Sequence, residues 1–317
     1  MKKIFCVGEL LIDFVAENQG NDLGHATVFT KKAGGAPANV ACAIAKLGGK
    51  SAFVGCIGED PFGDFLLEVL TENGVETLLV QRSPTFTTLA FVSIAEDGER
   101  DFVFSRGADR ELAYQERSGK AFEGNMLHLG AATALLGGPL ESAYSRYFYD
   151  GLIHEAFISF DPNFRHDLWK TREKEFVKKS LRFVEKAQLC KFSVEEARLL
   201  SGETDLVRAC DALHARGAET IVITLGAGGT YLSTPNGQET IPSIAIKPVD
   251  TTGAGDAFIG CLLYLLSREK DLFEAVKNQE LMAENVRIAN VAGALTTTRF
   301  GAIPSLPDQE QLKAALQ

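Results

Sequence analysis

Asp250-Thr251-Thr252-Gly253-Ala254-Gly255-Asp256 is followed by Ala257-Phe258-Ile259-Gly260 in this sequence of 317 residues, and this stretch decides its interpretation. It places a carboxylate directly after a glycine-rich turn, at the start of an apolar helix. A helix N-terminus offers unpaired N–H groups and a positive dipole end, and glycines let an anion approach them closely. An anion-binding turn that contains an acid fits phosphoryl transfer, because Asp256 can accept the proton of an attacking hydroxyl. Alone, the run also fits a tight turn followed by a first-turn acid.

The composition is that of an ordinary globular protein, with 45% apolar and 23% charged residues. The net charge of −10 argues against binding to nucleic acid or to anionic membranes, but not against an anionic small molecule. The most apolar segment, residues 257–266, is too short to span a bilayer. Residues 4–7 fit a first buried strand better than a secretory signal, because Glu9 and Asp13 interrupt the apolar run. We therefore expect a cytoplasmic protein.

The six cysteines lie mostly in apolar runs, and none forms a C-x-x-C pair. Buried, reduced thiols are expected from this pattern. The five histidines are scattered without the spacing of metal ligands. The residues therefore predict neither a disulfide framework nor a cysteine or histidine metal site.

Short runs rich in β-branched and aromatic residues alternate with helical patterns along most of the chain. Apolar strands separated by helices predict an α/β fold, with a mostly parallel central sheet covered by helices on both faces. We expect strands at residues 4–8, 51–57, 126–130, 157–161, 189–193 and 220–225. We expect helices at residues 37–47, 62–73, 141–153, 173–186, 205–216, 253–268 and 281–297.

Two stretches, residues 10–30 and 82–106, depart from this alternation and look like strands without helices. The dipeptide Asp97-Gly98 between two such runs is a hairpin signal. We predict one small β-sheet, built from about residues 10–33 and 82–108, that acts as a lid over a site and excludes water. Its outer face could pair with a second subunit. No interdomain linker is evident, so a single domain over residues 1–317 is expected.

Five motifs occur in the order typical of a known family. Residues 250–258 resemble the C-terminal signature of the PfkB (ribokinase-like) carbohydrate kinases, and residues 34–41 and 55–63 resemble the N-terminal signature. Residues 8–13 and 161–165 fit as well, so the resemblance covers nearly the whole chain. Within the family the motifs are most similar to those of bacterial fructokinases. The resemblance implies a ribokinase-like fold and a transfer from ATP to a primary sugar hydroxyl, foremost that of D-fructose to give fructose 6-phosphate.

The resemblance also implies catalytic roles. Asp256 corresponds to the base that deprotonates the sugar hydroxyl, and Gly253, Ala254 and Gly255 would supply the anion hole. Arg165 follows a strand end, where open α/β sheets place ligands. Its guanidinium would bridge the terminal phosphate of ATP and the substrate.

The sugar site is implied in the same way. The carboxylate of Asp13 would accept hydrogen bonds from sugar hydroxyls, and the bare backbone of Gly34 and Gly35 would lie against the sugar. Asn39, one turn into the following helix, would donate and accept further hydrogen bonds. Candidate lid contacts to the sugar are Phe91, Phe104 and Arg106, although both phenylalanines also fit a role in the core of the lid.

For the nucleotide, the run from Thr224 through Gly226 and Gly228 resembles the family's glycine-rich nucleotide loop, although it also fits a simple hairpin. It is not a Walker A loop, because no Gly-Lys-Ser/Thr follows. Asn290 resembles the family's residue on the adenine side. ATP is therefore the implied phosphoryl donor.

For metals, the family often carries Asn-x-x-Glu near Mg²⁺, and here Ser193 replaces the asparagine. Glu196 would act on Mg²⁺ through waters, and an acidic first helical turn is the competing explanation. Asp250 and Thr252 match part of the family's monovalent-cation site, together with carbonyl groups at residues 299–305. Potassium is thus an expected activator.

Other functions fit parts of the pattern. Within the family, a 2-keto-3-deoxygluconate kinase, a ribokinase or a riboside kinase are alternatives, because one sequence does not resolve the sugar. A catalytically silent sugar-binding protein on the same fold is a non-enzyme alternative. A nicotinamide-dependent oxidoreductase is disfavoured, because residues 8–13 lack the G-x-G-x-x-G pattern. The expected partners are a sugar and ATP, with a homodimer formed through the lid.

Overall fold

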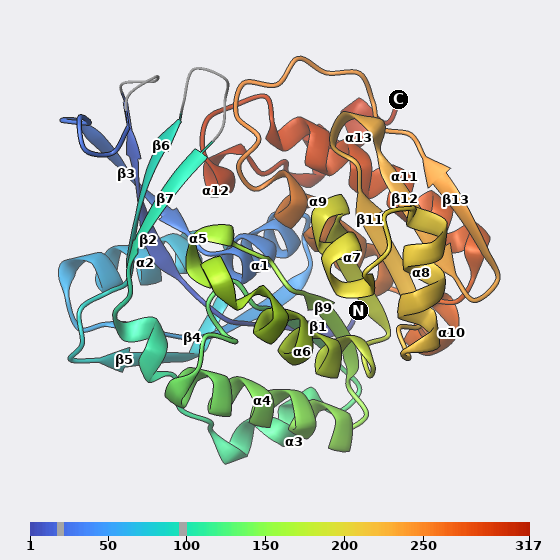
Figure 1. The fold of residues 1–317 in the computed structure, drawn as a ribbon, viewed down its shortest axis with the longest axis horizontal. Coiled ribbons are helices and arrows are strands. Elements are labelled where there is room, and N and C mark those ends of the chain that lie inside the picture. Colours follow the sequence, from blue (N-terminus) through green and yellow to red (C-terminus); the bar gives the residue numbers. More distant parts are fainter. Residues whose placement is uncertain (18–21, 95–99) are drawn as a thin grey trace.

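The computed structural model of the chain describes residues 1–17, 22–94 and 100–317, which form two β-sheets of different size (Figure 1). In this part of the chain the central sheet has nine strands in the order β13-β12-β11-β10-β9-β8-β1-β4-β5, and the smaller sheet has four in the order β3-β2-β6-β7. The central strands are β1 (Lys3–Val7), β4 (Lys50–Gly58), β5 (Glu76–Ser83), β8 (Met126–Gly130), β9 (Phe157–Asp161), β10 (Leu189–Ser193), β11 (Thr220–Thr224), β12 (Thr230–Thr234) and β13 (Gly237–Ile241).

The central sheet is parallel from β5 to β11, and β12 and β13 extend it in antiparallel fashion. Strands β8, β9 and β10 have the bounds expected from their apolar runs. The predicted mostly parallel sheet is therefore confirmed. Strands β5, β12 and β13 were not among the expected strands, and β5 and β13 are edge strands with short apolar runs.

Helices cover both faces of the central sheet because side chains alternate along each strand. In β1, Ile4 and Cys6 point into one core, whereas Phe5 and Val7 point into the other. The first core is closed by α1 (Ala36–Lys46), α2 (Pro61–Glu72), α9 (Ala254–Leu266) and α11 (Gln279–Thr296). The second is closed by α4 (Gly138–Ile153), α6 (Glu173–Val184), α7 (Val194–Ser201) and α8 (Leu206–Ala215). The shorter helices are α3 (Gly119–Phe122), α5 (His166–Trp169), α10 (Leu272–Ala275), α12 (Ala302–Ser305) and α13 (Gln309–Ala315).

The small sheet brings together the two stretches that lacked helical patterns. It consists of β2 (Leu11–Ala16), β3 (Phe29–Gly34), β6 (Leu89–Ile94) and β7 (Arg100–Ser105), and it stands beside the central sheet in Figure 1. The pairs β2–β3 and β6–β7 are antiparallel, and β2–β6 is parallel. The predicted small sheet is confirmed, whereas the predicted turn at residues 96–99 lies outside the described residues.

The chain order places a ligand site at one edge of the central sheet. Strand β1 lies between β4 and β8, so the chain first builds outward on one side of β1 and later on the other. Open α/β sheets bind ligands beyond the carboxyl ends of the strands at such a switch point. The segments that follow β1, β8, β9 and β10 all meet there.

Two expectations about the chain as a whole can be compared with the structure. All six cysteines are described, and each is buried and free of a disulfide, as their apolar surroundings predicted. Within residues 1–17, 22–94 and 100–317, no helix combines the length and the apolar character needed to cross a bilayer.

Candidate active site

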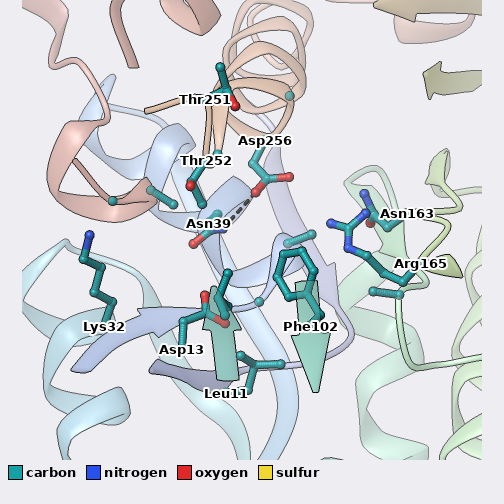
Figure 2. A pocket seen from close by; sticks show the side chains of 18 of the residues that line it. Leu11, Asp13, Lys32, Asn39, Phe102, Asn163, Arg165, Thr251, Thr252 and Asp256 are labelled. Carbon is teal, nitrogen blue, oxygen red and sulfur yellow. Dashed lines mark hydrogen bonds between the residues drawn. The ribbon is translucent and has the colours of Figure 1, made fainter. Parts of the chain in front are cut away.

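A cavity of about 800 Å³ lies where the strand ends of the central sheet meet the small sheet (Figure 2). Its walls are the strand ends, the first turns of α1 and α9, and one face of the small sheet. Eleven of the predicted site residues line it, namely Asp13, Gly35, Asn39, Phe104, Arg165, Glu196, Asp250, Thr252, Gly253, Gly255 and Asp256. Residues from distant parts of the sequence thus surround one space.

Helix α9 begins without a capping side chain. Its N-cap is Gly253, which has a φ of 78° and makes no side-chain hydrogen bond to the first turn. A Cβ atom at this position would lie 2.6 Å from the Cβ atom of Ala302, so only glycine fits. Ala254 opens the helix, and Gly255 follows it on the cavity wall. The Ala254 N–H group donates a 3.3 Å hydrogen bond to Thr251 O, and the other N–H groups of the turn have no capping side chain and can meet an anion.

Asp256 is the third residue of α9 and reaches the cavity. Its Oδ2 atom accepts a 2.8 Å hydrogen bond from Nδ2 of Asn39, drawn as a dashed line in Figure 2. Burial of the carboxyl group raises the pKa of Asp256, and Asn39, Lys191 and Arg165 partly offset this rise. A carboxylate with a raised pKa that faces a cavity is suited to accept a proton.

Asn39, the donor to Asp256, lies in the first turn of helix α1. Its N-cap, Gly35, has a φ of 113°, and a Cβ atom there would collide with the carbonyl oxygen of Glu9. Gly34 does not line the cavity, but a side chain there would collide with the carboxylate of Asp13. Both glycines therefore keep space beside acidic residues.

One face of the small sheet forms the cavity wall opposite α9. Asp13 on β2 pairs in register with Lys32 on β3, and both line the cavity. Lys32 also reaches the main body of the protein, because its Nζ atom lies 5.8 Å from the ring centre of Phe300. The small sheet thus contacts the loop before α12.

Aromatic residues occupy both faces of the small sheet. Phe102 and Phe104 line the cavity, with ring centres 6.0 Å apart. Phe91 lies on the other face, stacked on Phe14 with ring centres 5.4 Å apart. The expectation that Phe91 contacts the sugar is therefore wrong, because strand alternation turns it away. Phe102 was missed, although it stands two residues before Phe104 and shares its face.

Arg106 does not line the cavity either. Its Nη2 and Nε atoms donate hydrogen bonds of 2.6 Å and 3.2 Å to Oδ2 of the buried Asp109. Asp109 also accepts a hydrogen bond from the hydroxyl group of Thr88. The guanidinium group is thus held at the base of the lid, which corrects its assignment as a sugar contact.

Lys191, which sequence analysis did not single out, lies at the centre of the charged groups. It is 7% exposed, and its Nζ atom is 2.9 Å from Oδ2 of Asp161. Burial alone would lower the pKa of Lys191, but the carboxylates of Asp161, Glu196 and Asp256 outweigh burial and raise it. A lysine inside an apolar strand indicates a buried cluster of charged residues, because a buried ammonium needs anionic partners.

The carboxylate of Glu196 is buried and held by backbone hydrogen bonds, unlike that of Asp256. It is 4% exposed, and its two carboxylate oxygens accept 2.7 Å hydrogen bonds from the N–H groups of Ser193 and Phe164. The Ser193 hydroxyl oxygen accepts the Glu196 N–H at 3.1 Å, which completes a capping box. The acidic first turn therefore accounts for the S-x-x-E pattern. Glu196 also lines the cavity, and each of its oxygens can accept a second hydrogen bond, so the group also fits a water-mediated contact to Mg²⁺.

Asp250 anchors the loop that the motifs assign to a monovalent cation. The Oδ1 atom of Asp250 accepts hydrogen bonds from Thr252 N and Oγ1 at 2.9 Å and 2.6 Å, and Oδ2 accepts one from Gly301 N at 2.8 Å. The hydroxyl of Ser305 is fully buried and finds no hydrogen-bond partner in the described part of the chain. A buried Ser305 hydroxyl without a hydrogen-bond partner among the described residues, close in sequence to the Gly301 N–H that Asp250 binds, fits a ligand of a cation.

The predicted nucleotide residues lie outside this cavity. Thr224 ends β11 and donates a 3.3 Å hydrogen bond to Phe192 O, and Gly226 and Gly228 are exposed in the turn that follows. Asn290 is buried, donates to Ile241 O at 3.0 Å and accepts from Thr230 Oγ1 at 2.6 Å. These hydrogen bonds join α11 to the edge of the central sheet, and the place of Asn290 on the adenine side of a nucleotide stays a prediction.

Within the described ranges, no three or more His, Cys, Asp or Glu side chains are grouped so that they could hold a metal ion. The candidate metal residues therefore do not form a site in which protein side chains alone hold the ion. They suit ions that are held mainly by a bound substrate or by backbone oxygens.

Comparison with known proteins gives the family. The model of the pfkB family carbohydrate kinase matches residues 1–309. Fructokinase-1 of Oryza sativa subsp. japonica is 38% identical over 312 residues, covering 96% of this chain and 94% of the relative. The structure of fructokinase with bound ATP from Xylella fastidiosa superposes with a TM-score of 0.87 at 32% identity, covering 99% of this chain and 98% of that one. A fructokinase double mutant from Vibrio cholerae O395, with fructose, ADP and potassium ion bound, gives 0.86 at 34% identity, covering 100% and 99%. The resemblance carried by the motifs is thus confirmed, and the chain belongs to the pfkB family of carbohydrate kinases.

Proposed function

We propose that this chain is an ATP-dependent fructokinase, which transfers the γ-phosphoryl group of ATP to the 6-hydroxyl of D-fructose and releases fructose 6-phosphate. The observation that carries the proposal is the position of Asp256, which reaches the cavity beside an uncapped helix N-terminus and is oriented by Asn39. Both the Oryza and the Vibrio cholerae relatives are fructokinases, which supports fructose as the acceptor.

In the proposed reaction the sugar enters with one hydroxyl group against Asp256. The carboxylate accepts the proton of that hydroxyl while the oxygen attacks the γ-phosphorus and the bond to ADP breaks. The N–H groups of Gly253, Ala254 and Gly255 hold the charge that develops on the phosphoryl oxygens. Figure 2 shows Arg165 beside the same space, where its guanidinium can neutralise a phosphate oxygen.

The remaining walls would position the sugar. Asp13 and Asn39 would bond its hydroxyls, the backbone at Gly34 and Gly35 would approach it closely, and Phe102 and Phe104 would cover its apolar faces. We infer that about residues 10–33 and 82–108 act as a lid on a single domain of residues 1–317. Covering the site would exclude water, which otherwise competes with the sugar for the phosphoryl group.

Two ions complete the proposal. Bound to ATP, Mg²⁺ would neutralise phosphate charge, and Glu196 would hold its hydration shell. Asp250, Thr252 and Ser305 would take part in a potassium site, consistent with the potassium ion in the Vibrio cholerae fructokinase structure. That site adjoins the turn ending at Gly253, so the cation would set the position of the anion hole.

The decisive experiment is ADP release measured over about ten sugars and nucleosides, with and without K⁺. We expect D-fructose to give the highest kcat/KM and K⁺ to raise kcat. A higher kcat/KM with 2-keto-3-deoxygluconate, ribose or a nucleoside would reassign the substrate. Sugar binding without turnover of any acceptor would identify a silent binding protein.

We also propose a cytoplasmic homodimer that forms through the lid. Val103 on edge strand β7 is 53% exposed, and Val28, next to edge strand β3, is 48% exposed. Unpaired sheet edges with exposed apolar residues favour pairing with a second sheet. Val103→Asp should turn a dimer in analytical ultracentrifugation into a monomer, and a wild-type chain that sediments as a monomer would contradict the proposal. The buried free cysteines support a reducing compartment.

A further inference from the structure

We propose that Glu9, with Thr133 and Asn163, forms a second subsite of the cavity, which binds hydroxyl groups at the end of the sugar remote from the transferred phosphoryl group. Glu9 would thereby determine which sugars are accepted. The inference rests on the proposed function, because it assumes that the cavity receives a sugar whose reacting hydroxyl lies at Asp256.

Glu9 lies two residues after the end of β1 and is 2% exposed, yet it lines the cavity. Its Oε1 atom accepts a 3.1 Å hydrogen bond from the N–H group of Ala36, at the start of α1. Its Oε2 atom finds no hydrogen-bond partner in the described part of the chain. A buried carboxyl oxygen without a partner is costly, so a bound hydroxyl group that satisfies it gains affinity.

Other unpartnered acceptors line the same cavity. The Oγ1 atom of Thr133 and the Oδ1 atom of Asn163 are buried and lack partners among the described residues. Asn163 holds a φ of 46°, a conformation that few residues other than glycine adopt. Its Oδ1 atom and the ring of Pro37 both lie beside Gly130, which places it near the helix start that Glu9 contacts. Three strand ends therefore direct acceptors toward one region.

The chemistry of these groups selects the ligand class. A carboxyl group and an amide oxygen need hydrogen-bond donors, whereas a phosphate presents only acceptors and negative charge. Burial raises the pKa of Glu9 to about 7, Arg165 opposes this rise and Asp109 adds to it. Arg165 also lowers the pKa of Asp256, so its guanidinium acts on both carboxyl groups. The subsite therefore suits the hydroxyls of a polyol.

Helix α1 indicates which end of the sugar reaches Glu9. Ala36, which bonds Glu9, and Asn39, which bonds Asp256, are three residues apart. That separation is about 4.5 Å along a helix, close to one turn. A sugar that presents its 6-hydroxyl to Asp256 would extend its C1–C2 end toward Glu9.

The test compares D-fructose with two analogues, 2,5-anhydro-D-mannitol, which lacks the anomeric hydroxyl, and 1-deoxy-D-fructose, which lacks the C1 hydroxyl. Glu9→Gln keeps an oxygen for the Ala36 N–H and removes the unpartnered carboxyl oxygen. We expect about a tenfold rise in KM for fructose, an unchanged KM for ATP and a kcat within threefold. Preference for fructose over at least one analogue should fall by about the same tenfold. Calorimetric titration with fructose alone should show the same loss of affinity.

Glu17→Gln is the matched control. Glu17 also lines the cavity, but it is exposed and accepts a 2.7 Å hydrogen bond from Thr30, so its variant should leave KM for fructose within twofold. Thr133→Val is a second variant that removes an acceptor without touching α1, and it should also reduce discrimination. It decides the question if circular dichroism shows Glu9→Gln to be unfolded.

Two results would overturn the subsite. An equal loss with fructose and with both analogues would mean that Glu9 acts through the fold, and unchanged constants would mean that only water meets its free oxygen. Failure of the fructose assignment looks different, because the wild-type chain would then not phosphorylate fructose. In that case the same variants are assayed with deoxy analogues of the sugar that the wild-type chain does use.

Discussion

Helices α7 and α9 both begin on the cavity wall, and each has an acid in its first turn, but the two acids are held differently. Each carries an acid at its third residue, Glu196 in α7 and Asp256 in α9. In α7 the N-cap Ser193 and Glu196 bond each other's backbone N–H groups, so the carboxylate is 4% exposed and its oxygens are occupied. In α9 the N-cap Gly253 has no side chain, and Asp256 reaches the cavity.

The difference teaches that one side chain at the N-cap separates a structural helix start from a reactive one. A capping box satisfies the first-turn N–H groups from within the chain. A glycine cap leaves them for a ligand and leaves the acid free to move a proton. The start of α7 therefore stabilises the fold, and the start of α9 is available for the reaction.

The strongest way to break this comparison is Asp256→Asn. An amide cannot accept the proton of the attacking hydroxyl, so kcat should fall at least about 1,000-fold while ATP still binds. Coupled ADP-release assays and a nucleotide-binding titration measure the two quantities. More than a tenth of the wild-type kcat in the variant would remove Asp256 as the base.

Lys191→Met tests the charge that serves both helix starts. The Lys191 ammonium lowers the pKa of Asp256, so its loss should raise that pKa further. The base must be ionised to act. As the pH falls, the variant should therefore lose activity at a higher pH than the wild type does, and the acidic limb of its kcat/KM profile should lie about one pH unit higher. Lys191→Arg keeps the charge and serves as the control. An unmoved acidic limb in Lys191→Met, with the folded state intact, would show that the ammonium does not act on the base.

Glu196→Gln sharpens the comparison by asking whether α7 also serves the reaction. The amide can accept only one of the two N–H bonds, so unfolding free energy should drop by about 1 to 2 kcal/mol. We expect the Mg²⁺ concentration for half-maximal rate to rise several-fold and kcat to fall less than tenfold. A kcat loss as large as that of Asp256→Asn would abolish the distinction between the two helices.

Ser193→Ala should have the smallest effect. It removes the α7 cap and should cost about 1 kcal/mol in urea unfolding, with kcat within twofold of wild type. Ser193→Asn, which restores the residue more usual in the family, should keep that stability because asparagine also caps helices. A large loss of kcat in Ser193→Ala would place the hydroxyl in the reaction rather than in the cap.

The fold could be predicted from the sequence wherever burial made the pattern strong. Strands β8, β9 and β10 are buried on both faces, so their apolar runs gave their bounds directly. The small sheet was predicted from the absence of helical periodicity. Edge strand β5 was not, because its apolar run is only Leu78–Val80, with polar residues on both sides.

The candidate site could be predicted only where residue type and backbone geometry coincide. The glycines of the uncapped turn and Asp256 lie in one continuous stretch of sequence, so an anion-binding turn with an acid could be predicted there. The face of the small sheet to which each phenylalanine points was not, which is why Phe91 was assigned to the sugar and Phe102 was missed. Lys191 and Glu9 are charged residues inside apolar runs, and only the fold shows which groups surround them.

The two sheets divide the cavity in a way that bears on how such enzymes diversify. Groups proposed for phosphoryl transfer stand on the central sheet and its helices, whereas the wall facing them comes mostly from every second residue of the four strands of the small sheet. Exchanging every second residue of those strands reshapes the acceptor pocket and leaves the outward positions that anchor the flap unchanged. Descendants of one ancestor could therefore acquire new substrates through a few local substitutions, without rebuilding the machinery that handles ATP.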